Sequence, residues 1–559
     1  MIRNLLREKL KEALNKAGYT DTDPEILATS DSKFGDYYST IALKLKEKSN
    51  KQTLEATAKF IEAKIPKDET FFTTEVAPNG FINFKISDNY LQSQVQKIIE
   101  EDEDYGRLNI GKGKKVRVEF VSANPTGPLH IGNARGGPLG DTIASVLEFS
   151  GYQVIREYLN NNVGGQIEAL GATIAKRMGY YRGVKPVKEK EPAYQGNYIE
   201  ELAAKVKKQI EAEGGDKKYG MLSTIDQDSL YGSKAAKIMF EEIIADLKAM
   251  GIEYDKIAHE DELQTKLPDI LKVLENKQVI KKYEGAVWFA PKDESLKDKD
   301  AVVVKSDGSY TYFAGDIVYH KEKFESGADL VIDVFGSNTS GHVPKLRAAV
   351  AALGFDAKKL KTILYQFVRV KKGNEIVRMS KRAGDFVTAR EVLDEVGKDA
   401  FRFTLLMYDP NTHMDFDLEQ AKKQSEENPV YYVQYAHARC VSILKKAQGE
   451  DFDLRNLSKQ KLNLLNTSSE LYLIRKLIKF PELVEDIVSS KVGYPVHLWP
   501  LNTLRVADEL NRFYEQERVL GEEKEVSYAR LALILATKIV LRNSLQLMGI
   551  SAPEYMEKA

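Results

Sequence analysis

The sequence predicts an α/β protein in which a doubly wound parallel sheet lies between a small N-terminal α+β unit and a C-terminal helical bundle. Two strand–helix–strand units, at about 116–158 and 328–370, predict the parallel sheet, because a helix is the usual crossover between parallel strands. From about residue 395 onward the apolar residues repeat almost wholly at helical spacing, which predicts the separate bundle.

The composition excludes several classes of protein. Of the 559 residues, 43% are hydrophobic and 30% are charged, so sizeable cores are expected and wholesale disorder is not. Lys and Arg number 82 against 83 Asp and Glu, which excludes a globally basic nucleic-acid binder but not a local patch, such as the basic segment at 356–390. No apolar run is long enough for a membrane helix, and the first 20 residues lack the features of a targeting peptide. The single cysteine, Cys440, excludes a disulfide within the chain and Cys-ligated zinc, and fits a reducing cytoplasm.

The N-terminal unit combines helices with a strand. Helical patterns at 2–17 and 53–64 surround a short strand pattern at 81–86, and a charged, glycine-containing linker follows at 101–115. This mixture predicts an α+β fold for the unit.

The first strand–helix–strand unit carries a loop at the end of its first strand. Residues 116–121 alternate as a strand, and 121–129 contain two prolines and a glycine, which is typical of a loop. A helix is expected at about 133–151 and a second strand at 154–158. Open parallel sheets bind ligands at the carboxyl ends of their strands, so this loop is a candidate binding site.

The second unit repeats this pattern further along the chain. Residues 328–335 form a strand pattern, 343–353 form a helix that Gly354 ends, and 362–370 form another strand. The two units together predict one doubly wound sheet.

These elements divide the chain into three expected domains. A Lys/Glu-rich insertion of helical pattern, at about 170–300, separates the two units of the sheet. We expect an N-terminal α+β domain at 1–100, a sheet domain with this helical insertion at 112–395, and an all-α bundle at 396–559.

Two tetrads in the sheet domain can bind a nucleoside triphosphate. His130-Ile-Gly-Asn133 lies between a strand and a helix N-terminus, where unpaired backbone N–H groups and the helix dipole favour a phosphate. Arg378-Met-Ser-Lys381 follows the second unit, where its cations can clamp the β- and γ-phosphates of ATP. A turn histidine and a solvated charged face are the alternatives for the separate tetrads, and the pair in this order is the stronger signal.

The two tetrads are similar to the two signatures of class I aminoacyl-tRNA synthetases, and longer segments resemble arginyl-tRNA synthetases of the bacterial type. The segments are Val121–Gly132, Glu157–Ile167, Tyr312–His320, Met414–Leu418, Glu427–Arg439 and Leu547–Met556. The resemblance implies a Rossmann-like class I catalytic domain, an N-terminal domain at the tRNA elbow and a C-terminal helical domain at the anticodon.

The resemblance also implies the reaction and its partners. L-Arginine would be joined to the arginine tRNA through arginyl-adenylate, and activation would require bound tRNA. ATP and Mg²⁺ are the expected cofactors, with no zinc and no metal held by side chains of the protein. A cytoplasmic monomer that binds no membrane is expected.

Individual residues receive roles by the same resemblance. Catalysis is expected from His130, Asn133 and Lys381. The nucleotide is expected at Ser122, His130, Gly132, Asn133, Gly336, Asn338, His342, Met379, Ser380 and Lys381. Arginine is expected at Asn124, Gln166, Glu284, Tyr312, Asp316 and Tyr319, and tRNA at Phe34, Tyr38, Tyr432, Arg439 and Met556.

The residues expected to bind arginine also have a physical rationale. A guanidinium is a planar fork of donors, and a carboxylate such as Asp316 can accept two of its hydrogen bonds. A solvated surface carboxylate is the alternative for Glu284. Core packing is the alternative for Tyr319 and for the aromatic residues of the bundle.

The sequence departs from the family pattern at three positions. Asn133 stands where the family usually has His, Asn338 where it usually has an acid, and Asn162 where it often has Asp. Each change removes charge but keeps hydrogen bonding, so activity is still expected. A class I synthetase for another amino acid, a synthetase-like RNA-binding protein with weakened catalysis and a small-molecule nucleotidyltransferase remain alternatives.

Overall fold

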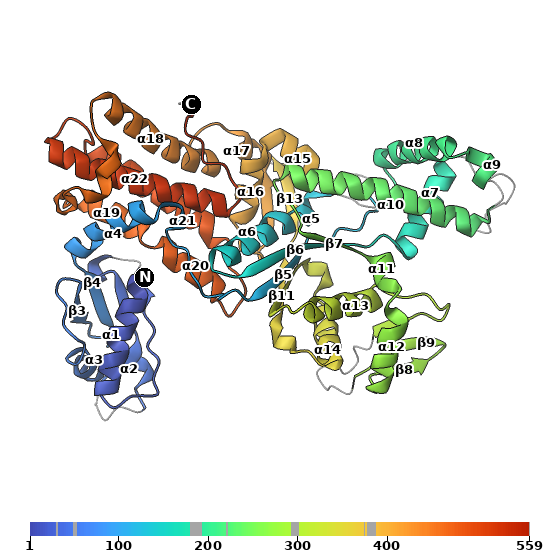
Figure 1. Cartoon of the computed structure of the whole chain (residues 1–559), viewed down its shortest axis with the longest axis horizontal. Helices are drawn as coiled ribbons and strands as arrows, with labels where there is room; N and C mark the ends of the chain where they lie inside the picture. The colour runs from blue at the N-terminus through green and yellow to red at the C-terminus, as the bar shows by residue number, and fades with distance from the viewer. Residues whose placement is uncertain are drawn as a thin grey trace.

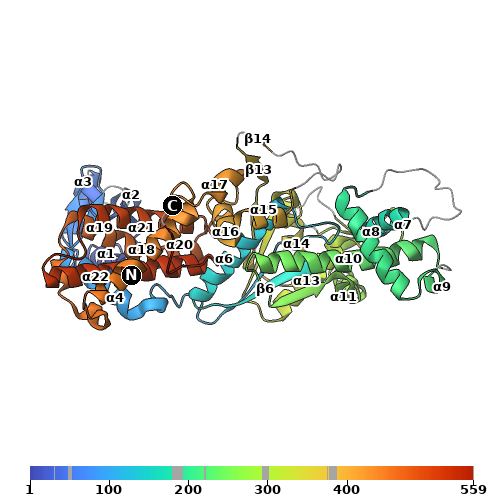
Figure 2. The same ribbon diagram turned by 90° about the horizontal axis from the view of Figure 1, so that it is seen from above.

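The computed structural model describes residues 1–29, 32–47, 53–178, 193–219, 222–291, 301–373, 375–376 and 387–557. The molecule is elongated, with the N-terminal domain and a helical arm toward opposite ends and the parallel sheet between them (Figures 1 and 2). None of the described helices is both long enough and apolar enough to cross a membrane.

The N-terminal domain is an α+β unit built around a small sheet. Its strands have the order β1-β2-β4-β3 and are antiparallel. The strand expected at 81–86 is β4, which is buried at every position except Lys85. The elements are α1 (Ile2–Lys16), β1 (Leu27–Ala28), β2 (Tyr37–Ser39), α2 (Ile41–Lys44), α3 (Leu54–Glu62), β3 (Phe72–Val76) and β4 (Ile82–Ile86).

A five-stranded parallel sheet with the order β12-β11-β5-β6-β7 forms the middle of the molecule. The chain runs outward through β5, β6 and β7 and then outward on the other side through β11 and β12, so the order reverses between β5 and β11. Open sheets bind ligands beyond the carboxyl ends at such a reversal. The strands are β5 (Lys115–Phe120), β6 (Gln153–Asn160), β7 (Lys256–His259), β11 (Leu330–Gly336) and β12 (Leu360–Tyr365). The helices nearest to them are α5 (Ile131–Ala134), α6 (Gly136–Phe149), α13 (Tyr312–Glu325) and α14 (Val343–Leu353).

The insertion expected to be helical over 170–300 contains strands as well as helices. The arm on the right of Figure 1 contains α7 (Gly165–Met178), α8 (Asn197–Ala212), α9 (Gly215–Tyr219) and α10 (Thr224–Ala249). Beyond residue 249 the helices alternate with strands that were not expected, because β7 is an edge strand of the parallel sheet and β8–β10 form an antiparallel sheet. Lysines at edge positions, such as Lys256 and Lys281, hide the strand pattern of these short segments. The elements here are α11 (Glu260–Gln264), α12 (Leu267–Asn276), β8 (Ile280–Tyr283), β9 (Ala286–Phe289) and β10 (Ala301–Val304).

Two other expected elements are divided. The strand expected at 362–370 splits into β12 and β13 (Val368–Lys372), which lie in different sheets. The chain turns at Gln366, and β13 pairs with β14 (Glu375–Ile376) and β15 (Met414–Asp417). The helical stretch at 466–489 is α19 (Ser468–Leu477) followed by α20 (Phe480–Val488), because Pro481 can begin a helix but not continue one.

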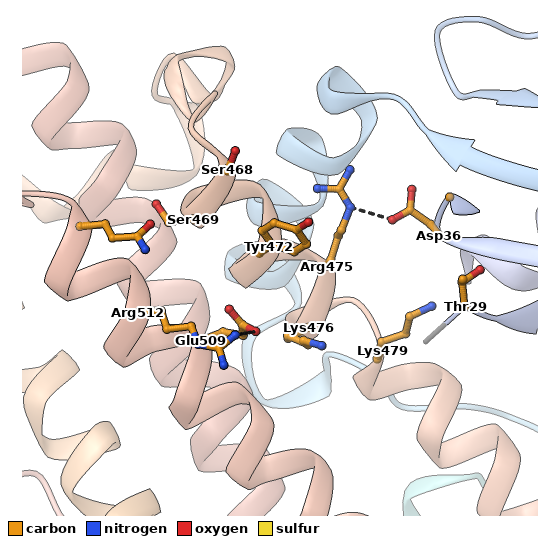
Figure 3. A pocket seen from close by; sticks show the side chains of 12 residues that line it. Thr29, Asp36, Ser468, Ser469, Tyr472, Arg475, Lys476, Lys479, Glu509 and Arg512 are labelled. Carbon is orange, nitrogen blue, oxygen red and sulfur yellow. Dashed lines mark hydrogen bonds and ion pairs between the residues drawn. The ribbon is translucent and has the colours of Figure 1, made fainter. Parts of the chain in front are cut away.

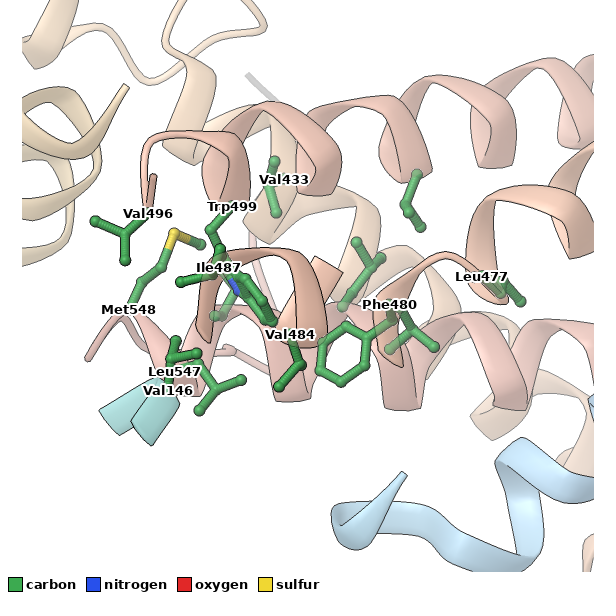
Figure 4. Close-up of a cluster of buried hydrophobic side chains, with 14 of the residues drawn as sticks. Val146, Val433, Leu477, Phe480, Val484, Ile487, Val496, Trp499, Leu547 and Met548 are labelled. Atoms are coloured by element: carbon green, nitrogen blue, oxygen red, sulfur yellow. The ribbon is translucent and has the colours of Figure 1, made fainter. Parts of the chain in front are cut away.

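The C-terminal bundle packs directly on the sheet domain. Trp499 is fully buried in a cluster with Phe480 and Met548, and Val146 of α6 joins the same cluster (Figure 4). The indole N–H of Trp499 donates to the carbonyl of Ser544 at 2.9 Å. The remaining helices are α4 (Asp88–Glu101), α15 (Ala389–Val396), α16 (Lys398–Leu406), α17 (Leu418–Lys422), α18 (Pro429–Gly449), α21 (Leu498–Gln516) and α22 (Lys524–Leu547).

Candidate active site

The carboxyl edge of the parallel sheet contains a cavity of about 130 Å³ at the point where the strand order reverses. Loops that follow β5, β11 and β12 form its walls. Residues expected at the nucleotide lie together in its lining: His130, Gly132, Asn133, Gly336 and Asn338. The structure therefore brings the first tetrad and the second strand–helix–strand unit to one cavity.

The imidazole of His130 has a defined orientation in this cavity. Its Nδ1 accepts a hydrogen bond from the backbone N–H of Asn133 at 3.2 Å, at the start of α5. A neutral ring held in this way carries its proton on Nε2, which leaves Nε2–H as the donor. A Cβ at Gly132 would lie 3.0 Å from the ring, so glycine at this position lets the imidazole keep its place.

Two residues near the cavity have structural roles that the sequence did not indicate. Tyr365, at the end of β12, donates from its hydroxyl to the carbonyl of Asn133 at 3.3 Å. Buried Arg135 donates to the carbonyls of Gln366 and Thr412, and burial lowers its pKa to about 10. Both side chains therefore connect α5, which contains part of the first tetrad, to the segment around β12 and β13.

Ser122 lies beneath the cavity rather than in its described lining. Its hydroxyl donates to Glu119 at 2.8 Å and accepts from the N–H of Leu159 at 3.0 Å. Val121 and Ser122 both have positive φ, at 69° and 38°, which is an uncommon conformation for these residues. These bonds hold the start of the loop that leads to His130.

The second tetrad lies outside the described residues, including the expected Met379, Ser380 and Lys381. The described chain on both sides of it reaches the cavity. Phe367, just before β13, lines the cavity, and Thr388 forms a β-bridge with His130.

A second group of polar side chains, which we call the acidic group, includes residues of α13. Tyr312 and Asp316 are one turn apart on α13, and Asp316 Oδ2 lies 2.7 Å from His342 Nε2. Burial acts to lower the pKa of His342, but the hydrogen bond and charge of Asp316 outweigh it and raise that pKa. His342 follows the cavity-lining loop after β11, so the acidic group adjoins this cavity.

Glu260 completes this acidic group, although the sequence analysis did not select it. It is 3% exposed, and a Cβ at Gly315 would lie 3.6 Å from its Oε1, so it faces the turn of α13 that carries Asp316. Its Oε2 has no hydrogen-bond partner among the described residues. Burial and the charge of Asp316 raise the pKa of Glu260 to about 7. Burial disfavours the charged form of this carboxyl group, and a cation beside it would favour that form.

Two residues expected at arginine lie outside this group. Glu284 is exposed in the turn between β8 and β9, with φ at 50°. Tyr319 is fully buried, and its hydroxyl donates to Glu157 at 3.0 Å, so the core alternative holds for it. Tyr319 is buried because α13 turns this position toward the sheet. A signal for Glu260 was present, since it directly follows β7 at the carboxyl edge.

The expected partners of the arginine head lie together. Asn124 donates to the side chain of Gln166 at 2.8 Å and accepts from Asn161 at 2.8 Å. The hydroxyl of Tyr194 donates to the carbonyl of Gln166 at 3.4 Å. Tyr194 also contributes to raising the pKa of Tyr312, after burial and the charge of Glu260.

A buried ionic network lies behind both groups. Lys323 is completely buried and its ammonium contacts Glu119 at 2.5 Å and Asp333 at 2.9 Å. His320 joins Asp333 at 2.9 Å and the carbonyl of Asp316 at 2.8 Å. The ammonium of Lys323 occupies the position that a cation would take among these carboxylates. The network fixes α13, and with it Asp316, on the sheet.

The residues expected at tRNA lie in the two outer domains. Phe34 is 58% exposed, whereas Tyr38 is half-buried and stacks on Phe81 with ring centroids 5.4 Å apart. In the bundle, the hydroxyl of Tyr432 donates to Asp508 at 2.8 Å. Arg439 donates to Asn511 at 2.6 Å and lies over the rings of Tyr435 and Tyr514; Met556 is half-buried in the C-terminal tail.

The fold and the site define the catalytic domain of a class I aminoacyl-tRNA synthetase. Residues 94–440 match the model of the class I (R) tRNA synthetase catalytic domain, and residues 433–556 match the DALR anticodon binding domain. Residues 4–86 match the arginyl tRNA synthetase N-terminal domain. The chain belongs to the arginyl-tRNA synthetase family.

Relatives and solved structures agree with this assignment. The chain is 39% identical to an arginine–tRNA ligase of Dehalococcoides mccartyi, with 99% of each chain covered. It is 38% identical to one of Carboxydothermus hydrogenoformans, over 98% of this chain and 97% of that protein. A putative arginyl-tRNA synthetase of Campylobacter jejuni has a TM-score of 0.72 at 30% identity, covering 84% of this chain and all of that one. The Thermus thermophilus arginyl-tRNA synthetase shares the fold over the whole of both chains, with a TM-score of 0.78 at 22% identity.

Proposed function

We propose that this chain attaches L-arginine to its tRNA in two steps. In the first, the carboxylate of arginine attacks the α-phosphate of ATP, and pyrophosphate leaves. In the second, a terminal ribose hydroxyl of the tRNA attacks the acyl carbon of arginyl-adenylate, and AMP leaves. The acidic pair of Glu260 and Asp316 beside a cavity lined by His130 is the observation that supports this reaction most strongly.

The nucleotide would be held mainly by position and charge. His130 would donate from Nε2 to the phosphoryl oxygens as their charge develops, and Asn133 would add a neutral donor at the helix N-terminus. Lys381 of the second tetrad would neutralise the departing pyrophosphate. Mg²⁺ would come with ATP and be bound by its phosphates, since the described residues that line the cavity carry no carboxylate.

Arginine would be recognised at both ends. Its guanidinium would lie between Glu260 and Asp316, with Tyr312 at the side. The two carboxylates would accept hydrogen bonds from the planar set of guanidinium N–H groups, which the ammonium of lysine does not have. Asn124 and Gln166 would hold the amino acid head toward the cavity. Glu260 takes the role that the sequence analysis gave to Glu284.

The outer domains would bind the tRNA. We assign the elbow to the N-terminal domain at 1–100, the chemistry to 112–395 and the anticodon to the bundle at 396–559. Stacking on Phe34 and Tyr38 at one end, and contacts of Tyr432, Arg439 and Met556 at the other, are part of this proposal. We also propose that the protein is a cytoplasmic monomer.

Charging of total tRNA with each of the twenty labelled amino acids tests the function. Arginine is expected to be the only amino acid that is transferred, and transfer should require both ATP and tRNA. Transfer of another amino acid at a comparable rate would assign a different specificity. Binding of tRNA without any transfer would instead indicate a non-catalytic RNA-binding protein.

The affinity for arginine is expected to fall at acid pH. Burial, followed by the charge of Asp316, raises the pKa of Glu260 to about 7. The guanidinium stays charged throughout and binds the ionised carboxylate, so the contribution of Glu260 is present above pH 7 and is lost below it. The KM for arginine should therefore rise by up to about tenfold per pH unit below pH 7.

Steady-state kinetics between pH 6 and pH 8.5 check this expectation. Glu260→Gln should raise the KM for arginine and flatten its pH dependence, whereas Glu284→Gln should leave both unchanged. A wild-type KM that is constant across this range would exclude the proposed role of Glu260.

A further inference from the structure

A second cavity, of about 530 Å³, lies where the N-terminal domain meets the helical bundle (Figure 3). We call it the junction pocket. Its walls come from α19, from α21 and from the segment before β2. Its lining contains four basic residues, Arg475, Lys476, Lys479 and Arg512, and two acidic residues, Asp36 and Glu509. It is separate from the active-site cavity, and none of its lining residues has been assigned to the reaction or to tRNA binding.

Two of the four cations hold the domains together. Arg475 lies 2.7 Å from Asp36 of the N-terminal domain, across the pocket wall in Figure 3. Lys479 lies 3.2 Å from Glu482 and 3.5 Å from the centre of the Tyr37 ring. These contacts give the pocket a fixed shape.

The other two cations are available to a ligand. Lys476 takes part in no ion pair within the described part of the chain, and the ion pair of Arg512 is with Glu509, one turn away at 3.1 Å. The side chain of Arg512 is 67% exposed. Ser468 and Ser469, the first residues of α19, also line the pocket, so the positive end of that helix dipole adds to the two cations. This combination favours a phosphate.

Exposed aromatic rings lie in the pocket lining and next to it. Tyr472 lines it and is 38% exposed, and the guanidinium of Arg475 lies 5.8 Å from its ring centre. Phe34, 58% exposed, adjoins the lining residue Gly35 on the N-terminal side. Cations interspersed with exposed rings are the chemistry of an RNA surface rather than of a free-anion site.

We propose that the junction pocket binds the sugar–phosphate backbone of the tRNA between the parts held by the N-terminal domain and by the bundle. This inference rests on the proposed function. Lys476 and Arg512 contact the phosphate, while Arg475 and Lys479 hold the N-terminal domain and the bundle in a fixed relative position. The pocket thereby couples the positions of the elbow and anticodon sites.

The double variant Lys476→Ala with Arg512→Ala tests the pocket, because neither side chain carries an interdomain contact among the described residues. Binding of arginine tRNA transcript is measured over a series of salt concentrations. The dissociation constant is expected to rise about tenfold, and the slope of log affinity against log salt to fall by about one. When tRNA is saturating, the KM values for ATP and arginine should not change. Lys272→Ala is the matched control, since Lys272 is exposed on α12 and pairs with Asp269 one turn away at 3.1 Å.

Three results would overturn the proposal. Wild-type affinity and slope in the double variant would show that the pocket does not contact tRNA. Weaker binding with an unchanged salt slope would indicate lost packing rather than a lost phosphate contact. Thermal stabilisation of the wild type by inorganic phosphate, together with unchanged tRNA affinity in the double variant, would indicate a free-anion site. Failure of the proposed function would differ from all three, because the wild-type enzyme would then charge no arginine.

Discussion

Asp316→Ala is expected to lower kcat/KM for arginine by about a thousandfold, which corresponds to ~4 kcal/mol. The guanidinium would lose one of its two carboxylates in a half-buried site, where removing one partner of a hydrogen-bonded charge pair costs several kcal/mol. His342 would lose its partner as well, and its pKa should fall because the hydrogen bond and charge of Asp316 raise it. ATP–pyrophosphate exchange with tRNA present measures the effect.

Two controls separate recognition from folding. Glu284→Ala should retain wild-type kinetics, since Glu284 is exposed in a hairpin turn. The KM of the Asp316 variant for ATP should change little, because the nucleotide cavity is lined by other residues. A normal KM for arginine in the Asp316 variant would contradict the assignment of the acidic group to the guanidinium.

His130→Ala is expected to lower kcat for arginyl-adenylate formation by about 10²–10³-fold, as loss of a single donor to a developing charge typically does. The imidazole is oriented by the N–H of Asn133, so its Nε2–H should act mainly in the transition state. The KM for ATP should therefore change much less than kcat. Single-turnover formation of the adenylate, with tRNA present, measures the step.

His413→Ala is the matched control for this variant, because His413 is exposed. The variant is expected to form the adenylate at the wild-type rate. Equal rates for wild type and the His130 variant would remove the imidazole from the chemistry, and a large rise in KM with an unchanged kcat would make it a ground-state binding residue.

Strong local patterns made much of the fold predictable from sequence. The helix at 343–353 ends where Gly354 adopts φ +97°, a conformation that glycine adopts without strain. The loop after β5 lies at the carboxyl edge, because topology alone places it there. Short edge strands were not predictable, since β7 and β8 have only four residues each and contain lysines, which are depleted in strands.

The nucleotide side of the site was easier to predict than the arginine side. His130, Gly132 and Asn133 are neighbours in the chain, so their proximity follows from one turn. Glu260 and Asp316 are 56 positions apart and meet only because α11 packs on α13. Choosing Glu260 over Glu284 required knowing which acid follows a strand of the parallel sheet.

The most direct test of this account compares arginine with citrulline, its neutral isostere, in ATP–pyrophosphate exchange with tRNA present. An acidic pair that recognises a charged guanidinium predicts that kcat/KM for citrulline is lower by about 10³-fold or more, because buried carboxylates would be left without a cation. Comparable activation of citrulline and arginine would contradict recognition by Glu260 and Asp316.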